Sequence, residues 1–299
     1  MRIGIDLGGT KIAGLLLDGR GRERARVRRA TPRGSYEATL RTIAEVVAEL
    51  EGPSAGAASV GVGMPGALSP ATGLVKNANS TWLNGRPLDR DLRELLGRPV
   101  RLQNDANCFA LSEATDGAAA GLPTVFGVIL GTGVGGGLVV DGAVLTGRDA
   151  IAGEWGHNPL PSPTDRERPG PRCYCGRSGC IETFLCGPAL AADAGAPDGE
   201  TAVALAERGE VAALAAWNRW LDRLGRALAG VVNLFDPHAI VLGGGLSRID
   251  GVYRELPDRI RPHVFSDRFE TPVLPPRYGD DSGLRGAAWL WPAAGEPAP

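Results

Sequence analysis

The chain has 299 residues, enough for one large domain or two of ordinary size, and 43% of them are hydrophobic, enough for full cores. Its net charge is −2 with acids and bases interspersed, so no basic patch for nucleic acid and no polybasic run for a membrane surface is present. No segment approaches the roughly 18 apolar residues of a membrane span, and MRIGIDLGG lacks the apolar stretch of a signal peptide. We therefore expect a globular, cytoplasmic protein whose partner is a small molecule, with neither nucleic acid nor membrane.

The first 120 residues alternate apolar runs with helical patterns, which favours an α/β sheet. Arg2–Leu7 and Lys11–Leu17 flank a Gly-Gly break and predict a strand, a glycine turn and a second strand. The further elements predicted in this half are strands at 25–29, 59–62 and 100–102 and helices at 35–51, 87–96 and 106–120.

The same pattern restarts at Thr124. An apolar run at 125–130, a glycine-rich turn at 131–137 and a second apolar run at 138–140 again predict strand, turn and strand. The elements that follow are a Pro-rich loop at 161–172, a long helix at 210–235, a strand at 239–242, helices at 252–260 and 283–291, and a disordered tail, PAAGEPAP. The architecture is thus duplicated, without a short repeat of the solenoid type.

Two stretches, GVGMPG at 61–66 and GTGVGG at 131–136, match the G-x-G-x-x-G pattern of dinucleotide-binding proteins. That pattern requires a helix directly after the glycines, so that its N-terminus meets the pyrophosphate. The first stretch contains Pro65 and continues into a turn, and the second continues into strand-like GLVV. Neither therefore predicts a dinucleotide site, and no P-loop motif occurs.

A pair of glycine turns between strands remains, DLGGTK at 6–11 and GTGVGGG at 131–137. Glycine lets backbone N–H groups approach an anion, and Thr10, Lys11 and Thr132 add side-chain donors. Two such turns facing each other across a cleft would hold the phosphates of a nucleotide. Each turn alone is equally compatible with a tight hairpin that binds nothing.

Seven spaced motifs resemble those of the ROK family of bacterial sugar kinases. They are DLGGTK (6–11), GMPG (63–66), NDAN (104–107), GTGVGG (131–136), EWGH (154–157), CYCGRSGCIE (173–182) and GGG (243–245). Four stretches resemble more specifically the fructokinase/mannokinase branch: VKNANSTWLNG (75–85), NDANC (104–108), EWGHNPLP (154–161) and GAAWLWP (286–292).

This resemblance implies an α/β, actin-like ATPase (sugar kinase) fold, with two α/β lobes around a central cleft that takes ATP and sugar. The N-terminal lobe is expected at 1–120, completed by the C-terminal helix 283–292, and the C-terminal lobe at 121–282 with a zinc-binding loop at 157–180. The positions expected to bind the nucleotide are Asp6, Gly8, Gly9, Thr10, Lys11, Gly131, Thr132, Gly133 and Gly135 around the phosphates, and Gly243, Gly244 and Gly245 near the adenosine.

Asp105 is the candidate catalytic base. Phosphoryl transfer to a sugar alcohol needs a group that accepts the hydroxyl proton, with donors and Mg²⁺ around the phosphates. Asp105 opens a predicted helix, whose N-terminus favours the ionised carboxylate. By position alone it is also a good N-cap, but it matches the family's catalytic base. Asp6 is an unusual residue at the end of an apolar strand unless it meets a cation or N–H groups.

Several polar side chains are of the kind that surround a sugar. The positions that the resemblance assigns to sugar contacts, beside Asp105 and the backbone of Gly66, are Asn79, Asn104, Glu154, His157 and Glu182. A solvated surface position is the alternative for any one of them taken alone.

His157, Cys173, Cys175 and Cys180 have the spacing H-x15-C-x-C-x4-C. Three thiolates and an imidazole suit tetrahedral Zn²⁺, although reduced structural thiols also fit the ligand count. The resemblance implies zinc, and four protein ligands make it a structural ion. The second ring nitrogen of His157 is then expected to donate to a sugar hydroxyl. The metal is also expected to fix the loop at 161–172, which has no evident core.

Together these motifs predict an ATP- and Mg²⁺-dependent hexose 6-kinase with structural Zn²⁺, acting on D-fructose and forming a homodimer. The alternatives are a mannokinase, a glucokinase or an N-acetylhexosamine kinase. A different class is a sugar-responsive regulator without catalysis, which in this family carries a helix-turn-helix before the sugar domain. Here the first motif begins at Asp6 and both phosphate turns are present, which favours the kinase.

Overall fold

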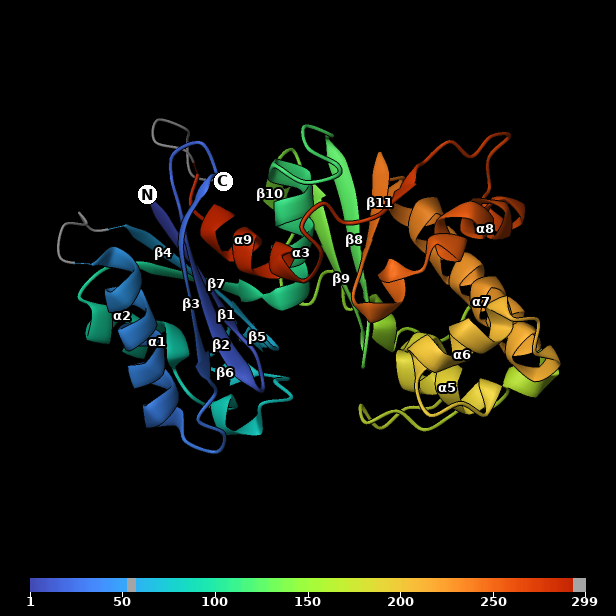
Figure 1. The fold of residues 1–299 in the computed structure, drawn as a ribbon, viewed down its shortest axis with the longest axis horizontal. Helices are drawn as coiled ribbons and strands as arrows, with labels where there is room; N and C mark the ends of the chain where they lie inside the picture. The colour runs from blue at the N-terminus through green and yellow to red at the C-terminus, as the bar shows by residue number, and fades with distance from the viewer. Residues whose placement is uncertain (53–57, 293–299) are drawn as a thin grey trace. The chain divides into compact units, whose positions relative to one another are not determined.

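The computed structural model describes residues 1–52 and 58–292, which fall into two compact units. Unit 1 comprises the described residues of 1–121, 137–152 and 281–299, and unit 2 comprises 122–136 and 153–280. Each is mixed α/β, as predicted (Figure 1). The lobe limits expected from the sequence stay a prediction, and residues 293–299 of the predicted disordered tail lie outside the described residues.

A five-stranded sheet forms the centre of unit 1, in the order β3-β2-β1-β4-β7. Its strands are β1 (Arg2–Leu7), β2 (Lys11–Leu17), β3 (Glu23–Ala30), β4 (Ser59–Met64) and β7 (Val100–Asn104). β2 runs antiparallel to β1, whereas β1, β4 and β7 are parallel. Parallel strands end at one edge of a sheet, so the motifs that follow these three strands share that edge.

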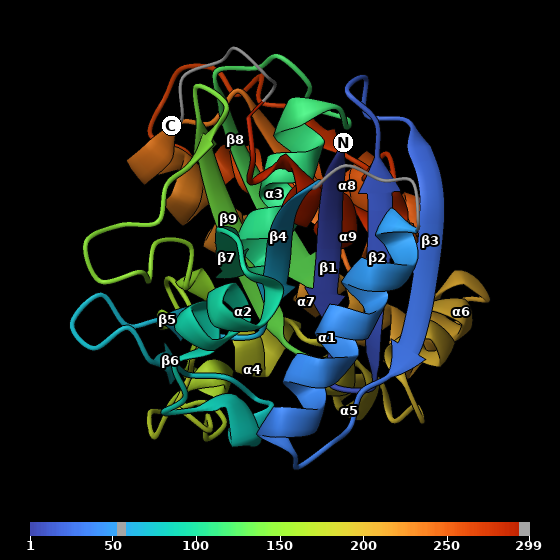
Figure 2. The same ribbon diagram turned by 90° about the vertical axis from the view of Figure 1, so that its left-hand side faces the viewer.

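Helices cover both faces of this sheet (Figures 1 and 2). α1 (Tyr36–Glu51) and α2 (Leu88–Leu96) lie on one face, and α3 (Asp105–Thr115) and α9 (Ser282–Trp289) lie on the other. α9 packs closely because its neighbours lack side chains: a Cβ at Gly61 would lie 1.8 Å from the Ala287 carbonyl. The predicted helix 106–120 ends early, at Thr115, because the Glu113 carboxylate accepts the Ala118 N–H in the turn that follows.

The second sheet has the order β10-β9-β8-β11-β12. Its strands are β8 (Thr124–Leu130), β9 (Val134–Val140), β10 (Ala143–Val144), β11 (Ala239–Gly243) and β12 (Val273–Leu274). β9 begins four residues before the predicted strand, so the turn is only Gly131–Gly133 and Gly135 lies in the strand. The small residues are needed there, since a Cβ at Gly136 would lie 2.7 Å from the Trp155 ring.

The helices of unit 2 are α4 (Glu182–Leu185), α5 (Gly187–Ala194), α6 (Gly199–Glu207), α7 (Val211–Phe235) and α8 (Asp250–Ile260). α7 confirms the long predicted helix and buries an apolar stripe that includes Trp220, Leu221, Leu224 and Leu228. Within the described residues, no helix is long and apolar enough to cross a membrane.

Candidate functional site

Three sequence motifs of unit 1 meet at the edge where β1, β4 and β7 end. The register places Asp6 beside Gly63 and Met64 beside Asn104. The Asn104 side-chain amide donates to the Gly66 carbonyl at 3.1 Å, and Gly66 has a φ of 71°, a conformation that favours glycine. The structure therefore brings DLGGTK, GMPG and NDAN to one edge of the sheet.

Asn104, and not Asp105, is the N-cap of α3. Its Oδ1 accepts the N–H groups of Ala106 at 2.9 Å and Asn107 at 3.4 Å. Asp105 is the first helical residue and is exposed, so its carboxylate lies where the peptide dipoles favour negative charge. The N-cap interpretation of Asp105 is thus wrong, and both polar ends of the Asn104 side chain are engaged within the protein.

Asp6 lies near two charged side chains of the same edge. Burial raises the pKa of Asp6 to about 6, the charge of Asp105 raises it too, and Lys11 opposes them. A cation or N–H donor that reached Asp6 would favour its charged form. Asn79 is exposed in the loop before a short 3₁₀ helix, and the neighbouring Ser80 hydroxyl faces Gly9.

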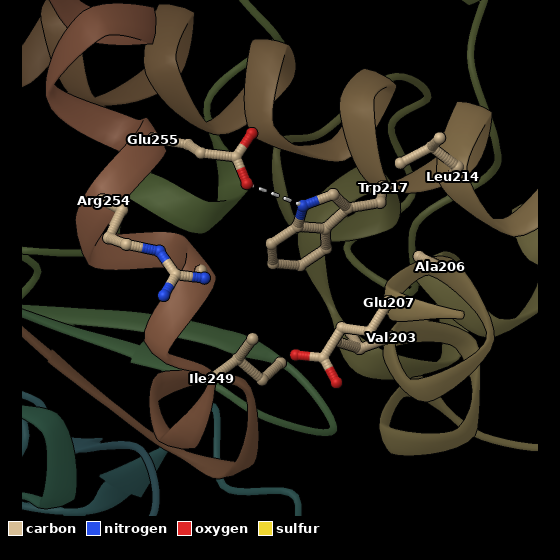
Figure 3. Close-up of a pocket in the computed structure, with 9 residues that line it drawn as sticks. Val203, Ala206, Glu207, Leu214, Trp217, Ile249, Arg254 and Glu255 are labelled. Atoms are coloured by element: carbon tan, nitrogen blue, oxygen red, sulfur yellow. Dashed lines mark hydrogen bonds between the residues drawn. The ribbon is translucent and has the colours of Figure 1, made fainter. Parts of the chain in front are cut away.

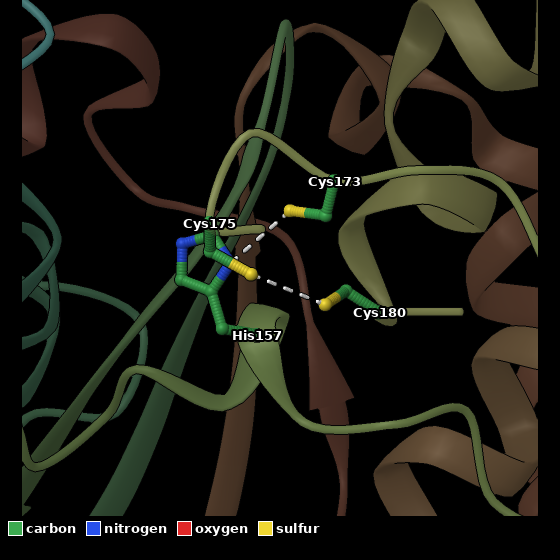
Figure 4. Close-up of side chains that lie close together, drawn as sticks. All are labelled: His157, Cys173, Cys175 and Cys180. Atoms are coloured by element: carbon green, nitrogen blue, oxygen red, sulfur yellow. Dashed lines mark hydrogen bonds between the residues drawn. The ribbon is translucent and has the colours of Figure 1, made fainter. Parts of the chain in front are cut away.

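The side chains of His157, Cys173, Cys175 and Cys180 converge in unit 2 (Figure 4). Their ligand atoms all lie within 4.8 Å of one another. Cys175 Sγ is 3.6 Å from Cys180 Sγ, and Cys173 Sγ is 3.6 Å from His157 Nδ1. Sulfurs held about 2.3 Å from a tetrahedral Zn²⁺ lie about 3.8 Å apart, so the cluster fits zinc.

The backbone of this knuckle supports the same conclusion. Gly176 and Gly179 both have positive φ, at 90° and 74°, which lets the chain turn tightly between the cysteines. Hydrogen bonds from Arg177, first from its backbone and then from its side chain, lower the pKa of the Cys175 thiol to about 6. A thiol that ionises this easily is ready to serve as a metal ligand.

The second ring nitrogen of His157 contacts a residue that the sequence analysis missed. His157 Nε2 lies 2.9 Å from the Tyr174 hydroxyl, and the two rings meet edge to face. Partial burial of this hydroxyl, followed by the charges of Glu182 and Glu154, raises the pKa of Tyr174 to about 12. Tyr174 thus lies among three predicted sugar-binding residues; the only signal for it was an aromatic residue between two metal ligands.

Glu182 connects the knuckle with the second glycine turn. Its Oε2 accepts the Val134 N–H at 3.0 Å, and its Oε1 is 4.0 Å from Cys173 Sγ. A Cβ at Gly133 would lie 2.6 Å from the same carboxylate, so only glycine leaves room for it. The far side of the turn is closed by the Gly187 N–H, which donates to the Gly131 carbonyl at 2.8 Å.

The Pro-rich loop, which has no evident core in the sequence, has an anchor of its own besides the Cys–His cluster. Glu167 is buried and accepts from Arg223 at 2.8 Å and from Arg226 at 2.9 Å. Burial raises the pKa of Glu167, yet these arginines and the Thr164 N–H outweigh it and hold the value at about 2. Arg226 also donates to the carbonyls of Pro161 and Ser162, so this ion-pair cluster, Glu167–Arg223–Arg226, holds the loop on α7.

The glycine run at 243–245 ends β11. Gly244 has a φ of 82° and packs on the Leu130 backbone, where a Cβ would lie 2.4 Å from the Leu130 carbonyl. A cavity of about 140 Å³ lies between α6, α7 and α8 (Figure 3). Ile249 and Gly251, a few residues after the glycine run in the chain, form part of its lining. Val203, Ala206, Leu214 and Ile249 form its apolar walls, and the side chains that give it polarity are Glu207, Trp217, Arg254 and Glu255. Trp217 donates to Glu255 at 3.4 Å.

The model of the ROK family matches residues 2–294. An N-acetyl-D-glucosamine kinase of Citrobacter koseri is 41% identical over 302 residues, which cover 97% of this chain and 99% of that protein. This relative is thus an N-acetyl-D-glucosamine kinase, and not a member of the fructokinase/mannokinase branch that four stretches of the sequence resemble.

Among solved structures, a ROK hexokinase from Thermus thermophilus aligns with a TM-score of 0.84 and 35% identity over 96% of each chain. A ROK family glucokinase from Streptomyces griseus, in complex with glucose and AMPPNP, aligns with a TM-score of 0.74 and 29% identity over 96% of this chain and 97% of that one. The predicted α/β, actin-like sugar kinase fold is confirmed by this likeness.

Proposed function

Because this chain belongs to the ROK family, we propose that it transfers the γ-phosphoryl group of ATP to the 6-hydroxyl of a hexose, with N-acetyl-D-glucosamine as substrate. The observation that carries the proposal is the edge of the first sheet, where the carboxylate of Asp105 lies at a helix N-terminus near Asp6 and the first glycine turn. Such an edge supplies both a base and donors for phosphate.

Asp105 takes the proton of the attacking hydroxyl in this proposal. Asp105 is exposed, and its Oδ1 accepts the Ala106 N–H at 2.8 Å, a group that the Asn104 side chain also caps. Asn104 also connects the helix to Gly66, which fixes the carboxylate relative to the loop after β4. A base held in this way needs no large movement to meet a hydroxyl.

The two glycine turns bind the phosphates. Lys11 and Thr10 supply side-chain donors in unit 1, and Thr132 supplies one in unit 2, each at an exposed position. Mg²⁺ would neutralise charge on the transferred phosphoryl group. Asp6, beside Lys11 and Asp105, is the acidic residue that we assign to this ion. Gly135 lies in β9, and its carbonyl accepts from Trp155, so its contribution is to strand packing beside the turn.

We assign the adenosine to the cavity that follows Gly243–Gly245. Val203 and Ile249 offer apolar walls and Trp217 an aromatic one, which suits a planar base. Figure 3 shows the Glu207 carboxylate below the Trp217 ring and the Arg254 guanidinium to the left of it.

Glu154, His157 and Glu182 bind the sugar in this proposal, with Asn79 as a further contact. Structural zinc, held by His157, Cys173, Cys175 and Cys180, would fix the orientation of the His157 ring. With Nδ1 bound to the metal, His157 Nε2 carries the ring N–H and presents it on the side where the Tyr174 hydroxyl lies, 2.9 Å away.

Fructose is the second candidate substrate. The stretches 75–85, 154–161 and 286–292, which resemble the fructokinase/mannokinase branch, favour it. The homodimer stays a prediction.

A substrate panel tests the proposal. We expect ATP-dependent turnover, with the highest kcat/KM on N-acetyl-D-glucosamine when fructose, mannose and glucose are measured beside it. A higher kcat/KM on fructose would move the assignment to the second candidate. Absence of turnover on every hexose, in a protein that retains its metal, would contradict the kinase assignment.

A further inference from the structure

The segment Thr31–Arg33, directly after β3, lies along the first glycine turn and binds its carbonyl groups. The Thr31 hydroxyl donates to the Gly8 carbonyl at 2.7 Å, and the Thr31 N–H donates to the Thr10 carbonyl at 3.0 Å. Arg33 Nε donates to the Gly9 carbonyl at 2.9 Å. Three successive carbonyls of the turn are therefore occupied by one short segment.

This arrangement decides which polar groups the turn offers to a ligand. A carbonyl oxygen repels a phosphate, whereas a free N–H attracts one. Because the carbonyls of Gly8, Gly9 and Thr10 accept hydrogen bonds from this segment, they repel an anion less. Among the described residues, the Gly9 and Thr10 N–H groups have no backbone acceptor, so they remain available for an anion.

Arg33 differs from the other arginines of the neighbouring strand. On β3, Arg24 pairs with Asp18, Arg26 with Glu23, and Arg29 with Glu49. No ion pair of Arg33 is found within residues 1–52 and 58–292, and its side chain is exposed. Its positive charge is therefore uncompensated while its Nε is fixed on Gly9.

We propose that Arg33 is a positioning residue for the nucleotide phosphates: it orients the Gly9 peptide through its carbonyl and adds positive charge beside the turn. Thr31 orients the Gly8 peptide in the same way, through the Gly8 carbonyl, but adds no charge. The inference rests on the proposed function only in naming the ligand, a nucleoside di- or triphosphate.

Titration calorimetry with Mg²⁺·ADP tests the proposal without any sugar. We expect Arg33→Ala to weaken nucleotide binding about 10- to 100-fold, as for loss of a charge-assisted hydrogen bond. Arg33→Lys keeps the charge but not the bond to Gly9, so it should restore part of the affinity. Thr31→Val removes the bond to the Gly8 carbonyl without changing any charge, and it should weaken nucleotide binding several-fold.

Arg24→Ala is the matched control, because it removes the same charge from an exposed position paired with Asp18. Its nucleotide affinity should stay within twofold of the wild type. In turnover assays Arg33→Ala should raise the KM for ATP and leave the dissociation constant of the hexose unchanged, a split that general destabilisation would not produce.

Equal nucleotide affinity in Arg33→Ala and the wild type would overturn the proposal, and so would equal losses in Arg33→Ala and Arg24→Ala. A wild-type protein that binds Mg²⁺·ADP but phosphorylates no hexose would instead contradict the proposed function. In that case the comparison of Arg33→Ala with the wild type still decides the role of Arg33.

Discussion

The two glycine turns have the same place in their sheets but different surroundings. The turn between β1 and β2 is bordered by ionisable groups, Asp6 and Lys11, and Arg33 binds its carbonyl side. The turn between β8 and β9, Gly131–Gly133, contains no ionisable residue, and a carboxylate, Glu182, accepts the N–H of Val134, which directly follows it.

This difference suits the first turn to phosphate binding and proton transfer, and the second turn to a connection with the proposed sugar site. Unit 1 gathers the groups that carry or receive charge, which is what proton transfer and phosphate binding need. Unit 2 connects its turn through Glu182 to the Cys–His knuckle, so the proposed sugar contacts and the turn should depend on one another. Changes at the first turn and Asp105 should therefore alter turnover or nucleotide affinity, and changes at the Cys–His knuckle should alter sugar affinity.

Asp105→Ala should give the largest effect. Loss of the base is expected to lower kcat about 10²- to 10⁴-fold, while sugar and nucleotide affinities stay near those of the wild type. Steady-state kinetics measures kcat, and calorimetry measures the sugar and nucleotide affinities. Asp105→Asn, which keeps the shape, should be nearly as slow. Turnover within tenfold of the wild type would remove Asp105 from the chemistry.

Cys175→Ser tests the knuckle with little direct loss of packing, since Cys175 is exposed. We expect bound zinc to fall, sugar affinity to drop about 10- to 100-fold, and the affinity for Mg²⁺·ADP to stay unchanged. Cys186→Ser, outside the cluster, is the control. A zinc-depleted protein with wild-type sugar affinity would break the connection between metal and sugar site.

Gly133→Ala tests the contact of the second turn with Glu182. The new methyl group would lie 2.6 Å from the Glu182 carboxylate and should displace it, at a cost of about 1–3 kcal/mol in the free energy of unfolding. Gly131→Ala is the matched control, because a Cβ there meets nothing within 4 Å. Urea unfolding compares the two, and equal stability would show that Glu182 can move freely.

Asp6→Asn gives the smallest effect. The pKa of Asp6 is raised in the folded state, to about 6, so this residue stabilises the fold fully below about pH 4 and loses that contribution as pH rises through 6. The amide does not titrate, so the variant should avoid a loss of about 1–2 kcal/mol, a value reduced for partial exposure. Urea unfolding between pH 4.5 and 7.5 should show a steeper decline for the wild type; parallel curves would contradict the pKa of Asp6.

Much of the fold was predictable because its signals are local. Apolar runs broken by glycines placed the strands, and the 3.6-residue period of 211–235 placed α7. The start of β9 was missed because a glycine-rich strand lacks the apolar alternation on which a strand prediction depends. The end of α3 was missed because a side chain, Glu113, satisfies the turn that follows it.

The sequence by itself determined the two glycine turns, the α/β character and the H-x15-C-x-C-x4-C ligand set, since each follows from residue type and spacing along the chain. Only the tertiary structure decided that Asn104 caps α3, that Tyr174 meets His157, that Glu167 anchors the Pro-rich loop and that Arg33 binds Gly9. The physical reason is that spacing constrains the backbone, whereas the partner of a side chain depends on how distant segments pack.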